Sequence, residues 1–276
     1  MPLEICALNS GSNGNCYYLA SSHEAVLIDA GIPCKEVERR MESLGLKMEK
    51  LKAIFISHEH ADHIGGLSIL SKRYNLPVYI TPLTLRNCRS RIEKHLIRAF
   101  KSYEPVNIGS LSITAFPKAH DASDPYSFTV SSADTRVGVF TDIGVPCAHL
   151  IRHFSECDAA FLESNYDEEM LDRGNYPYFL KNRIRGGKGH LSNRQALDLF
   201  QRHRAPHMTH LFLSHLSKNN NCPKLVQQLF EQVAETVKIV VASRFEHTAL
   251  FQINGTTTPP LLPMAMQEGG QLELGF

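Results

Sequence analysis

The sequence predicts an α/β fold, a four-layer αββα sandwich in which two sheets pack face to face between outer helices. Short hydrophobic strands alternate with helical segments along most of the 276 residues. The two halves also echo each other, because "AVLIDAG" (25–31) is similar to "GVFTDIG" (138–144) and "AIFISHEH" (53–60) is similar to "LFLSHLS" (211–217). In each case a hydrophobic strand ends in a histidine or an aspartate, so two similar sheets would bring these side chains to one rim. A chance likeness between short apolar motifs is the competing explanation.

The first half of the chain is rich in short strands. The turn "GSNGN" (11–15) separates the first two strands, and a third ends in Asp29 and Gly31. A helix follows and stops near Gly45. The segments expected as strands are 3–11, 16–22, 25–31, 51–57 and 76–81, and those expected as helices are 34–46, 64–74 and 83–100.

The second half begins with strands separated by turns and then alternates between helix and strand. The expected strands are 110–120, 125–132, 135–144, 158–164, 210–215 and 237–243, and the expected helices are 147–155, 194–203 and 223–235. Residues 255–276 have little periodicity and are rich in proline and glycine. The sequence therefore predicts one domain over residues 1–254, followed by a flexible C-terminal tail.

Composition narrows the class of protein. The net charge is +1, so an affinity for a polyanion must come from local patches and not from the field of the whole molecule. The seven cysteines include no C-x-x-C pair, which favours free thiols in a reducing compartment. The N-terminus lacks the features of a signal peptide, and no apolar run approaches the ~20 residues that a membrane span needs. We therefore expect a soluble, cytoplasmic protein.

The most informative segment is "SHEHADHIGG" (57–66), which directly follows the hydrophobic run "LKAIFI" (51–56). Two imidazoles two residues apart on extended backbone, His58 and His60, can point the same way. Neutral imidazole is a common ligand of zinc-like ions. Asp62 and His63 follow at the start of the next helix, where a second ion could bind.

These four residues cannot complete two metal sites, so further ligands are needed. The candidates at later strand ends are His120 in "FPKAHDAS", Asp142 in "VFTDIG" and His215 in "LFLSHLS". A single histidine at a strand end is ordinarily a surface or core residue. A cluster of five ionisable side chains at positions 58–63 is much harder to explain structurally.

The chain resembles the metallo-β-lactamase superfamily, whose H-x-H-x-D-H signature is intact here as His58, His60, Asp62 and His63. That resemblance implies two divalent metal ions, Zn or Mn. It implies that one ion is held by His58, His60 and His120, that the other is held by Asp62, His63 and His215, and that Asp142 bridges both. It also implies that Asp29 supports the metal-binding loop through hydrogen bonds.

Four further motifs, "SGSNGNCYYL", "LESNYD", "GHLSN" and "LSHLSKNNN", are similar to the YycJ/WalJ-like branch of bacterial DNA exonucleases. The same motifs are similar to ribonuclease Z and the β-CASP nucleases, and this resemblance implies that Glu163 and His190 assist proton transfer. Asp62 is also expected in the catalytic group. His190 is also the rival of His215 for the last metal position. An alternative is that His190 lies in a loop before a helix capped by Ser192 or Asn193.

Two basic stretches offer cations for a phosphate backbone. Lys181, Arg183, Arg185 and Lys188 precede His190, and arginine can pair with phosphate through two parallel hydrogen bonds. A second stretch lies at 86–98, where a solvated helix face is an equal alternative. The glycines of "GSNGN" could turn backbone N–H groups towards an anion, or could form a plain hairpin turn.

The prediction is a dinuclear metal-dependent phosphodiesterase, a 5′→3′ DNA exonuclease acting in DNA repair or replication. The alternatives are a thioester or lactone hydrolase of the same fold and a non-catalytic adaptor. The C-terminal "QLELGF" resembles the hexapeptide that binds the bacterial DNA polymerase sliding clamp, with matches at Gln271, Leu272, Leu274 and Phe276. A closing strand of the domain is the alternative for this segment.

Overall fold

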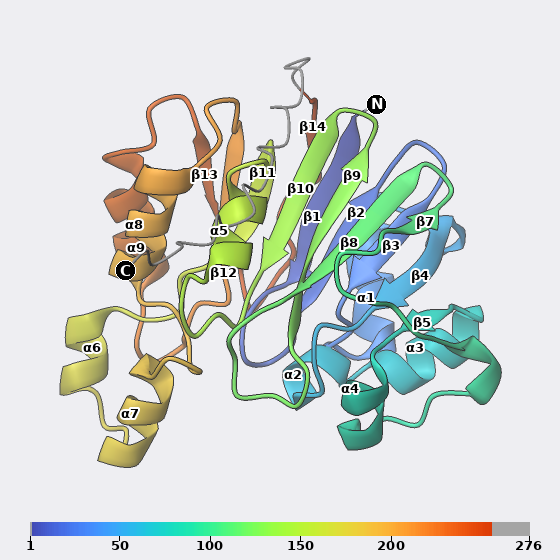
Figure 1. Ribbon diagram of the computed structural model, residues 1–276, viewed down its shortest axis with the longest axis horizontal. Helices are drawn as coiled ribbons and strands as arrows, with labels where there is room; N and C mark the ends of the chain where they lie inside the picture. The colour runs from blue at the N-terminus through green and yellow to red at the C-terminus, as the bar shows by residue number, and fades with distance from the viewer. Residues whose placement is uncertain (1, 256–276) are drawn as a thin grey trace, which may run out of the picture.

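The computed structural model describes residues 2–255 and confirms the four-layer αββα sandwich (Figure 1). Two seven-stranded sheets pack face to face, and helices cover their outer faces. The C-terminal tail from residue 256 onward, with Gln271, Leu272, Leu274 and Phe276, lies outside the described residues. Within the described range no helix is long and apolar enough to cross a membrane.

The first sheet is built from the N-terminal part of the chain and one late strand. Its neighbours are antiparallel from β14 to β3 and parallel from β3 to β6, which suits an α/β unit with helices on one face. In spatial order its strands are β14 (Phe251–Ile253), β1 (Leu3–Asn9), β2 (Cys16–Ala20), β3 (Ala25–Ile28), β4 (Leu51–Phe55), β5 (Val78–Tyr79) and β6 (Ile97–Arg98). The helices that follow its strands are α1 (Cys34–Ser43), α2 (Ala61–Ile64), α3 (Leu67–Tyr74) and α4 (Pro82–Asn87).

The second sheet repeats this plan. It is parallel from β10 to β13 and antiparallel from β7 to β10. In spatial order its strands are β13 (Lys238–Val241), β12 (His210–Ser214), β11 (Ala159–Glu163), β10 (Thr135–Phe140), β9 (Tyr126–Ser132), β8 (Leu111–Pro117) and β7 (Val106–Ile108). Its outer face is covered by α5 (Ala148–Phe154), α8 (Asn193–His203) and α9 (Pro223–Glu231).

Three apolar clusters hold the layers together. The central one lies between the sheets and includes the fully buried rings of Phe128, Phe161 and Phe212 together with Tyr17. One further cluster joins each sheet to its outer helices. Burying a ring of this kind contributes on the order of 1.5–3 kcal/mol. This packing holds the two sheets against each other and so sets the relative position of their strand ends.

The structure corrects some of the predicted elements. The expected helix 83–100 is wrong beyond Asn87, because residues 97–98 join the edge of the first sheet as β6. The segment in between, "CRSRIE", has no apolar stripe that could hold a helix against the sheet. The helix expected over 64–74 is divided at Gly65 and Gly66 into α2 and α3. Strand β14 and two helices, α6 (Glu168–Arg173) and α7 (Tyr178–Arg185), were not predicted.

A close backbone contact fixes the loop that carries the histidines. A Cβ atom at Gly31 would lie 1.8 Å from the carbonyl oxygen of Asp62. Two hydrogen bonds tie the same backbones together, from Asn15 N to Asp62 O at 2.7 Å and from Ala30 N to His63 O at 2.9 Å. Only glycine at position 31 therefore lets the loop after β3 approach the start of α2.

We predict that Gly31→Ala lowers the free energy of unfolding by about 1–3 kcal/mol, the usual range for a forced shift in a packed region. The new methyl group must displace the backbone of Asp62. Chemical denaturation measures the effect, and Gly187→Ala is the matched control because its Cβ would meet only Val145 at 3.7 Å. Equal stability of the two variants would contradict the prediction.

Candidate metal centre

Three histidines converge at the rim where the strands of both sheets end. His58 and His60 follow β4, and His120 follows β8. His58 Nε2 lies 3.0 Å from His60 Nδ1, which lies 3.3 Å from His120 Nε2. Burial lowers the pKa of His58 well below its ordinary value and that of His120 to about 4. Neutral rings with free nitrogen electron pairs are the form in which histidine binds a metal.

A second group lies beside the first. Asp62, His63, Asp142 and His215 each offer one ligand atom, and these atoms all lie within 4.8 Å of one another. His63 Nε2 is 3.1 Å from Asp142 Oδ2, and His215 Nε2 is 3.4 Å from Asp62 Oδ2. The other oxygen of Asp142, Oδ1, is 3.8 Å from His120 Nε2. The Asp142 carboxylate therefore reaches both groups of candidate ligands.

Glu163 connects the last two histidines. Its Oε1 atom accepts hydrogen bonds of 2.8 Å from the Nδ1 atoms of both His190 and His215. Its Oε2 atom accepts from the backbone N–H groups of Ile143 and Leu191 at 2.8 and 3.0 Å. The carboxylate is completely buried, so these four donors fix it in place.

His190 and His215 differ in their exposure and in what their side chains face. His215 is 2% exposed, and its Nε2 atom faces Asp62 in the second group. The side chain of His190 is 20% exposed and lines the pocket at the rim. His190 also lies close to Asp142, Glu163 and His215, but its greater exposure favours His215 as the candidate ligand of the second group and places His190 at the pocket.

The charge of the site favours a cation. Burial opposes ionisation of His63, but the carboxylates of Asp142, Asp29 and Asp62 outweigh it and raise the pKa of His63 well above its ordinary value. For His215, burial is likewise outweighed, by Asp142, Asp62 and Glu163, which raise the pKa to about 10. Negative charge that stabilises protonated imidazoles in this way also stabilises a divalent ion, which displaces those protons on binding.

The donor atoms fit a divalent metal. Asp142 Oδ2 and His215 Nε2 are buried and have no well-formed hydrogen bond within the described chain. A buried polar atom without a partner is costly, and metal ligation is one of the few ways to satisfy it. Mixed imidazole and carboxylate donors suit first-row divalent ions. The structure thus brings together all seven residues expected as metal ligands from the sequence.

The loop from β3 supports these ligands. Asp29 accepts from Ser57 N and Ser57 Oγ at 2.8 Å each, and its Oδ2 lies 2.7 Å from His63 Nδ1. Ser57 Oγ is also 2.9 Å from His58 Nδ1. A ligand histidine whose other ring nitrogen is fixed in this way keeps its orientation and tautomer. The supporting position expected for Asp29 agrees with this network.

Three other contacts escaped the sequence reasoning. Ser57 was seen only as the residue before the cluster. Asn15, singled out only as part of the glycine turn, places its Nδ2 atom 3.2 Å from Asp62 Oδ2. Lys118 is buried, and its Nζ donates at 2.7 Å to the carbonyl oxygen of Thr141, the residue before Asp142. A lysine two residues before His120 was the only available signal.

Three residues of this site have an unusual backbone conformation. Asp29, Asp142 and His215 each follow a strand and have φ angles of 61°, 56° and 55°. This left-handed region is uncommon for residues other than glycine, and such positions cluster at functional sites. The turn it produces aims each side chain back over the rim of its sheet.

The histidines open into a pocket of about 240 Å³. One wall belongs to α7, through Leu180, Arg183 and Ile184. Of the cations expected to bind substrate, Arg183 lines this pocket and also pairs with Asp121 at 2.5 Å. Arg185 pairs with Asp172, and Lys181 donates to the carbonyl oxygen of the same residue at 2.7 Å. Lys188 is exposed and forms no ion pair within residues 2–255.

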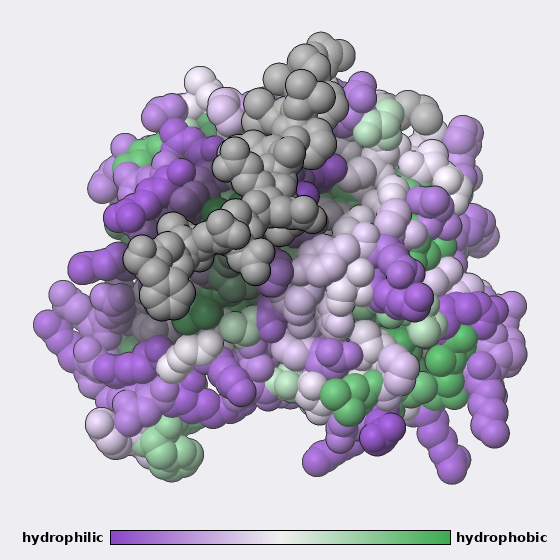
Figure 2. All heavy atoms as spheres, in the orientation of Figure 1, coloured by the Kyte–Doolittle hydropathy of each residue, from purple (hydrophilic) through white to green (hydrophobic). Residues whose placement is uncertain are grey.

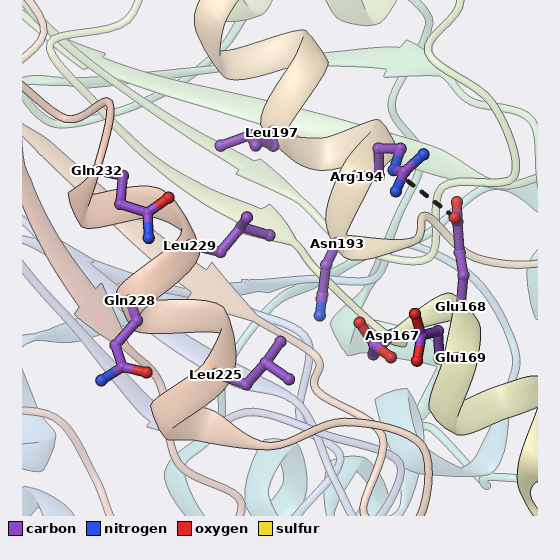
Figure 3. A pocket seen from close by; sticks show the side chains of 10 residues that line it. All are labelled: Asp167, Glu168, Glu169, Asn193, Arg194, Leu197, Leu225, Gln228, Leu229 and Gln232. Carbon is purple, nitrogen blue, oxygen red and sulfur yellow. Dashed lines mark ion pairs between the residues drawn. The ribbon is translucent and has the colours of Figure 1, made fainter.

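A larger cleft of about 350 Å³ lies between α6, α8 and α9 (Figure 3). Its rim is acidic, with Asp167, Glu168 and Glu169 on one side, and Arg194 forms an ion pair with Glu168. Leucine side chains from α8 and α9 face its interior. None of the candidate metal ligands lines this cleft, so the smaller pocket is the candidate active site.

The fold and the cluster define a metal-dependent hydrolase. Residues 24–215 match the description "Beta-lactamase superfamily domain". The exodeoxyribonuclease YycJ of Bacillus anthracis is 30% identical over 249 residues, which cover 89% of this chain and 94% of that protein. The exodeoxyribonuclease WalJ of Streptococcus pneumoniae serotype 2 (strain D39 / NCTC 7466) is 31% identical over 234 residues, covering 83% and 87%.

Among solved structures, the metallo-β-lactamase fold protein YhfI from Bacillus subtilis superposes with a TM-score of 0.71 at 17% identity, covering 91% of this chain and 100% of that one. This likeness concerns the fold. The chain belongs to the beta-lactamase superfamily and, within it, to the YycJ/WalJ-like branch. The resemblance read from its motifs is confirmed.

We predict that His60→Ala removes most of the bound metal and the activity together. His60 Nδ1 lies 3.0 Å from His58 Nε2 and 3.3 Å from His120 Nε2, so its loss removes the central donor of the three-histidine group. Elemental analysis of the purified protein measures metal content. His23→Ala is the control, because that histidine is exposed and distant from the cluster in sequence. Normal metal stoichiometry and turnover in His60→Ala would disprove the assignment.

Proposed function

We propose that this protein is a dinuclear metal-dependent phosphodiesterase, a 5′→3′ DNA exonuclease that acts in DNA repair or replication. The observation that carries the proposal is the position of Asp142, whose two oxygen atoms lie 3.1 Å from His63 Nε2 and 3.8 Å from His120 Nε2. A carboxylate between two groups of ligands suits a pair of metal ions. The exodeoxyribonuclease names of YycJ and WalJ support DNA as the substrate.

The ligands divide into two sets. His58, His60 and His120 would hold one ion, Zn or Mn, Asp62, His63 and His215 the other, and Asp142 would contact both. The chemistry supplied by such a pair is acidification of a water molecule and stabilisation of the phosphodiester oxygens. Asp62 is at the pocket surface and would also orient the attacking group.

His190 would donate a proton to the departing oxygen of the phosphodiester. Its Nδ1 atom is engaged by Glu163 at 2.8 Å, which leaves Nε2 directed to the pocket that it lines. Burial opposes ionisation of Glu163, but His190 and His215 outweigh it and lower the pKa of Glu163 to about 2, so the carboxylate stays negative at neutral pH.

The phosphate backbone would be bound by cations of α7 and the loop after it. Arg183 lines the pocket and Lys188 is exposed, whereas Lys181 and Arg185 would have to leave Asp172 to reach a phosphate. Residues 1–254 would form this hydrolase domain. A cytoplasmic location fits a DNA substrate and the free state of the seven cysteines.

The function is tested with duplex DNA labelled at either the 5′ or the 3′ end. The metal-loaded protein is expected to release 5′-terminal nucleotides first, and a chelator is expected to stop the reaction. Release from the 3′ end would reverse the polarity. Binding of DNA without hydrolysis would indicate an adaptor, and hydrolysis of thioesters or lactones alone would indicate a different hydrolase.

We predict that His190→Ala keeps its metal and loses on the order of 10²–10⁴ in rate, the usual range for general acid–base catalysis. Single-turnover kinetics on labelled DNA measure the rate, and elemental analysis measures the metal. His207→Ala serves as the control, since that histidine is not among the candidate metal ligands. If His190→Ala instead lost one metal equivalent, His190 would be a ligand and His215 would need another role.

The proposal extends to the sliding clamp. The match of Gln271, Leu272, Leu274 and Phe276 to the hexapeptide motif supports it, because such peptides bind by inserting a few apolar anchors into a pocket. We predict that Leu274→Ala/Phe276→Ala abolishes retention of the protein on immobilised clamp. Leu261→Ala/Leu262→Ala is the matched control. Equal retention of both double variants would rule the motif out.

A further inference from the structure

Helices α6 and α7 form an arm at one end of the rim, set apart from the two sheets (Figure 1). The arm occupies the connection between β11 and α8. Its second helix borders the candidate active site, because Leu180, Arg183 and Ile184 line the pocket of the histidines. Tyr176, just before α7, lines the same pocket. The first turn of α7 therefore lies between two segments that face the reaction centre.

Two aromatic side chains on the first turn of α7 are largely exposed to solvent. Tyr178 is 80% exposed and Phe179 is 73% exposed. Within the described residues neither ring stacks on another ring or on a cation. Burying a phenylalanine side chain stabilises a fold, so two neighbouring exposed rings forgo that stabilisation. Figure 2 shows pale green, hydrophobic atoms at the lower tip of this arm with hydrophilic atoms around them.

The segment that carries these rings is rich in cationic side chains, of which Arg183 pairs with Asp121 and Arg185 with Asp172. Residues 178–188, "YFLKNRIRGGK", contain four cationic side chains and no acidic one. Aromatic rings beside a basic track are the two components with which proteins bind unpaired nucleic acid: the cations follow the phosphates and the rings stack on the bases.

Spacing along the helix connects the rings to the pocket. Phe179 and Arg183 are four residues apart and so lie on the same side of α7, about 6 Å apart along its axis. That distance is about two base steps of a nucleic-acid strand, which rises about 3.4 Å per nucleotide in a duplex. A phosphate near Arg183 would thus bring a base one or two nucleotides away to Phe179. Tyr178 extends the apolar surface around the helix end.

We propose that Tyr178 and Phe179 form a base-stacking subsite that holds an unpaired nucleotide next to the phosphodiester being cut. This rests on the proposed nuclease function and specifies its substrate class. Neighbouring bases cover both faces of an internal paired base, and a blunt end leaves one face of its last pair free, whereas an unpaired nucleotide exposes both faces for stacking. The arm therefore selects DNA ends with unpaired nucleotides over blunt, fully paired ends.

The subsite is tested by removing either partner of the stack. The metal-loaded full chain is titrated against a labelled duplex with a 5′ single-stranded tail, protected by phosphorothioate linkages, and fluorescence anisotropy reports the dissociation constant. A second duplex carries abasic nucleotides in its tail. The variants are Tyr178→Ala/Phe179→Ala and the aromatic replacement Tyr178→Phe/Phe179→Trp. The control is Tyr103→Ala, an exposed ring that is occupied by stacking on His153.

Stacking of one base contributes about 1–3 kcal/mol, so the double alanine variant is expected to bind the normal tail about tenfold or more weakly. The abasic tail is expected to weaken the wild type equally and the double alanine variant no further. The aromatic replacement and Tyr103→Ala should bind as the wild type does.

Unchanged affinity of the double alanine variant, or further loss of its affinity on the abasic tail, overturns the subsite. The nuclease function then survives as long as the wild type cuts the labelled duplex. If the wild type neither binds nor cuts DNA, both proposals fall. If the double alanine variant bound both the normal and the abasic tail more weakly than the wild type by the same factor, the rings would instead serve another partner or the fold of the arm.

Discussion

The structure depends on how it stabilises buried negative charge at the rim of its two sheets. Asp29, Asp142 and Glu163 are at most 2% exposed, and Asp62 lies among them. Unpaired carboxylates in such a place are very costly. The protein compensates each one with specific donors: serine and backbone N–H groups for Asp29, two imidazoles and two backbone N–H groups for Glu163. Around Asp142 the imidazoles of His63 and His215 lie within 3.5 Å of the carboxylate, so the negative charge of this rim meets nitrogen donors that suit a divalent cation.

This charge can be concentrated only because both sheets end in the same place. The first sheet supplies Asp29 and the histidines after β4, and the second supplies Asp142, Glu163 and His215. Left-handed backbone at Asp29, Asp142 and His215 turns these side chains over the rim. The aromatic packing between the sheets holds the strand ends in fixed positions. The free energy gained in the core thereby offsets the cost of the left-handed residues and the buried carboxylates at the site.

The parts of the molecule outside the sandwich give the site its individual character. The solved structure of YhfI superposes on 91% of this chain at only 17% identity, so the fold tolerates wide divergence in sequence. The arm of α6 and α7 adds a basic helix with exposed rings beside the pocket, while the ligands remain on the sheets. Under the proposed function, substitutions in this arm would alter recognition of the substrate and leave the candidate metal ligands in place.

The sequence by itself determined the order of the layers and the histidine cluster, because hydrophobic strands and the H-x-H-x-D-H spacing are local patterns. It also pointed to His120, Asp142 and His215 as residues that end strands. Only the tertiary structure decided that Glu163 binds both His190 and His215, that Ser57 and Lys118 support the ligands, and that residues 97–98 form an edge strand instead of a helix. The arm escaped prediction because α7 buries none of its residues and so has no apolar stripe to reveal it. Contacts between residues distant in the chain depend on how the sheets pack. The hydrophobic periodicity of a short segment carries no information about that packing.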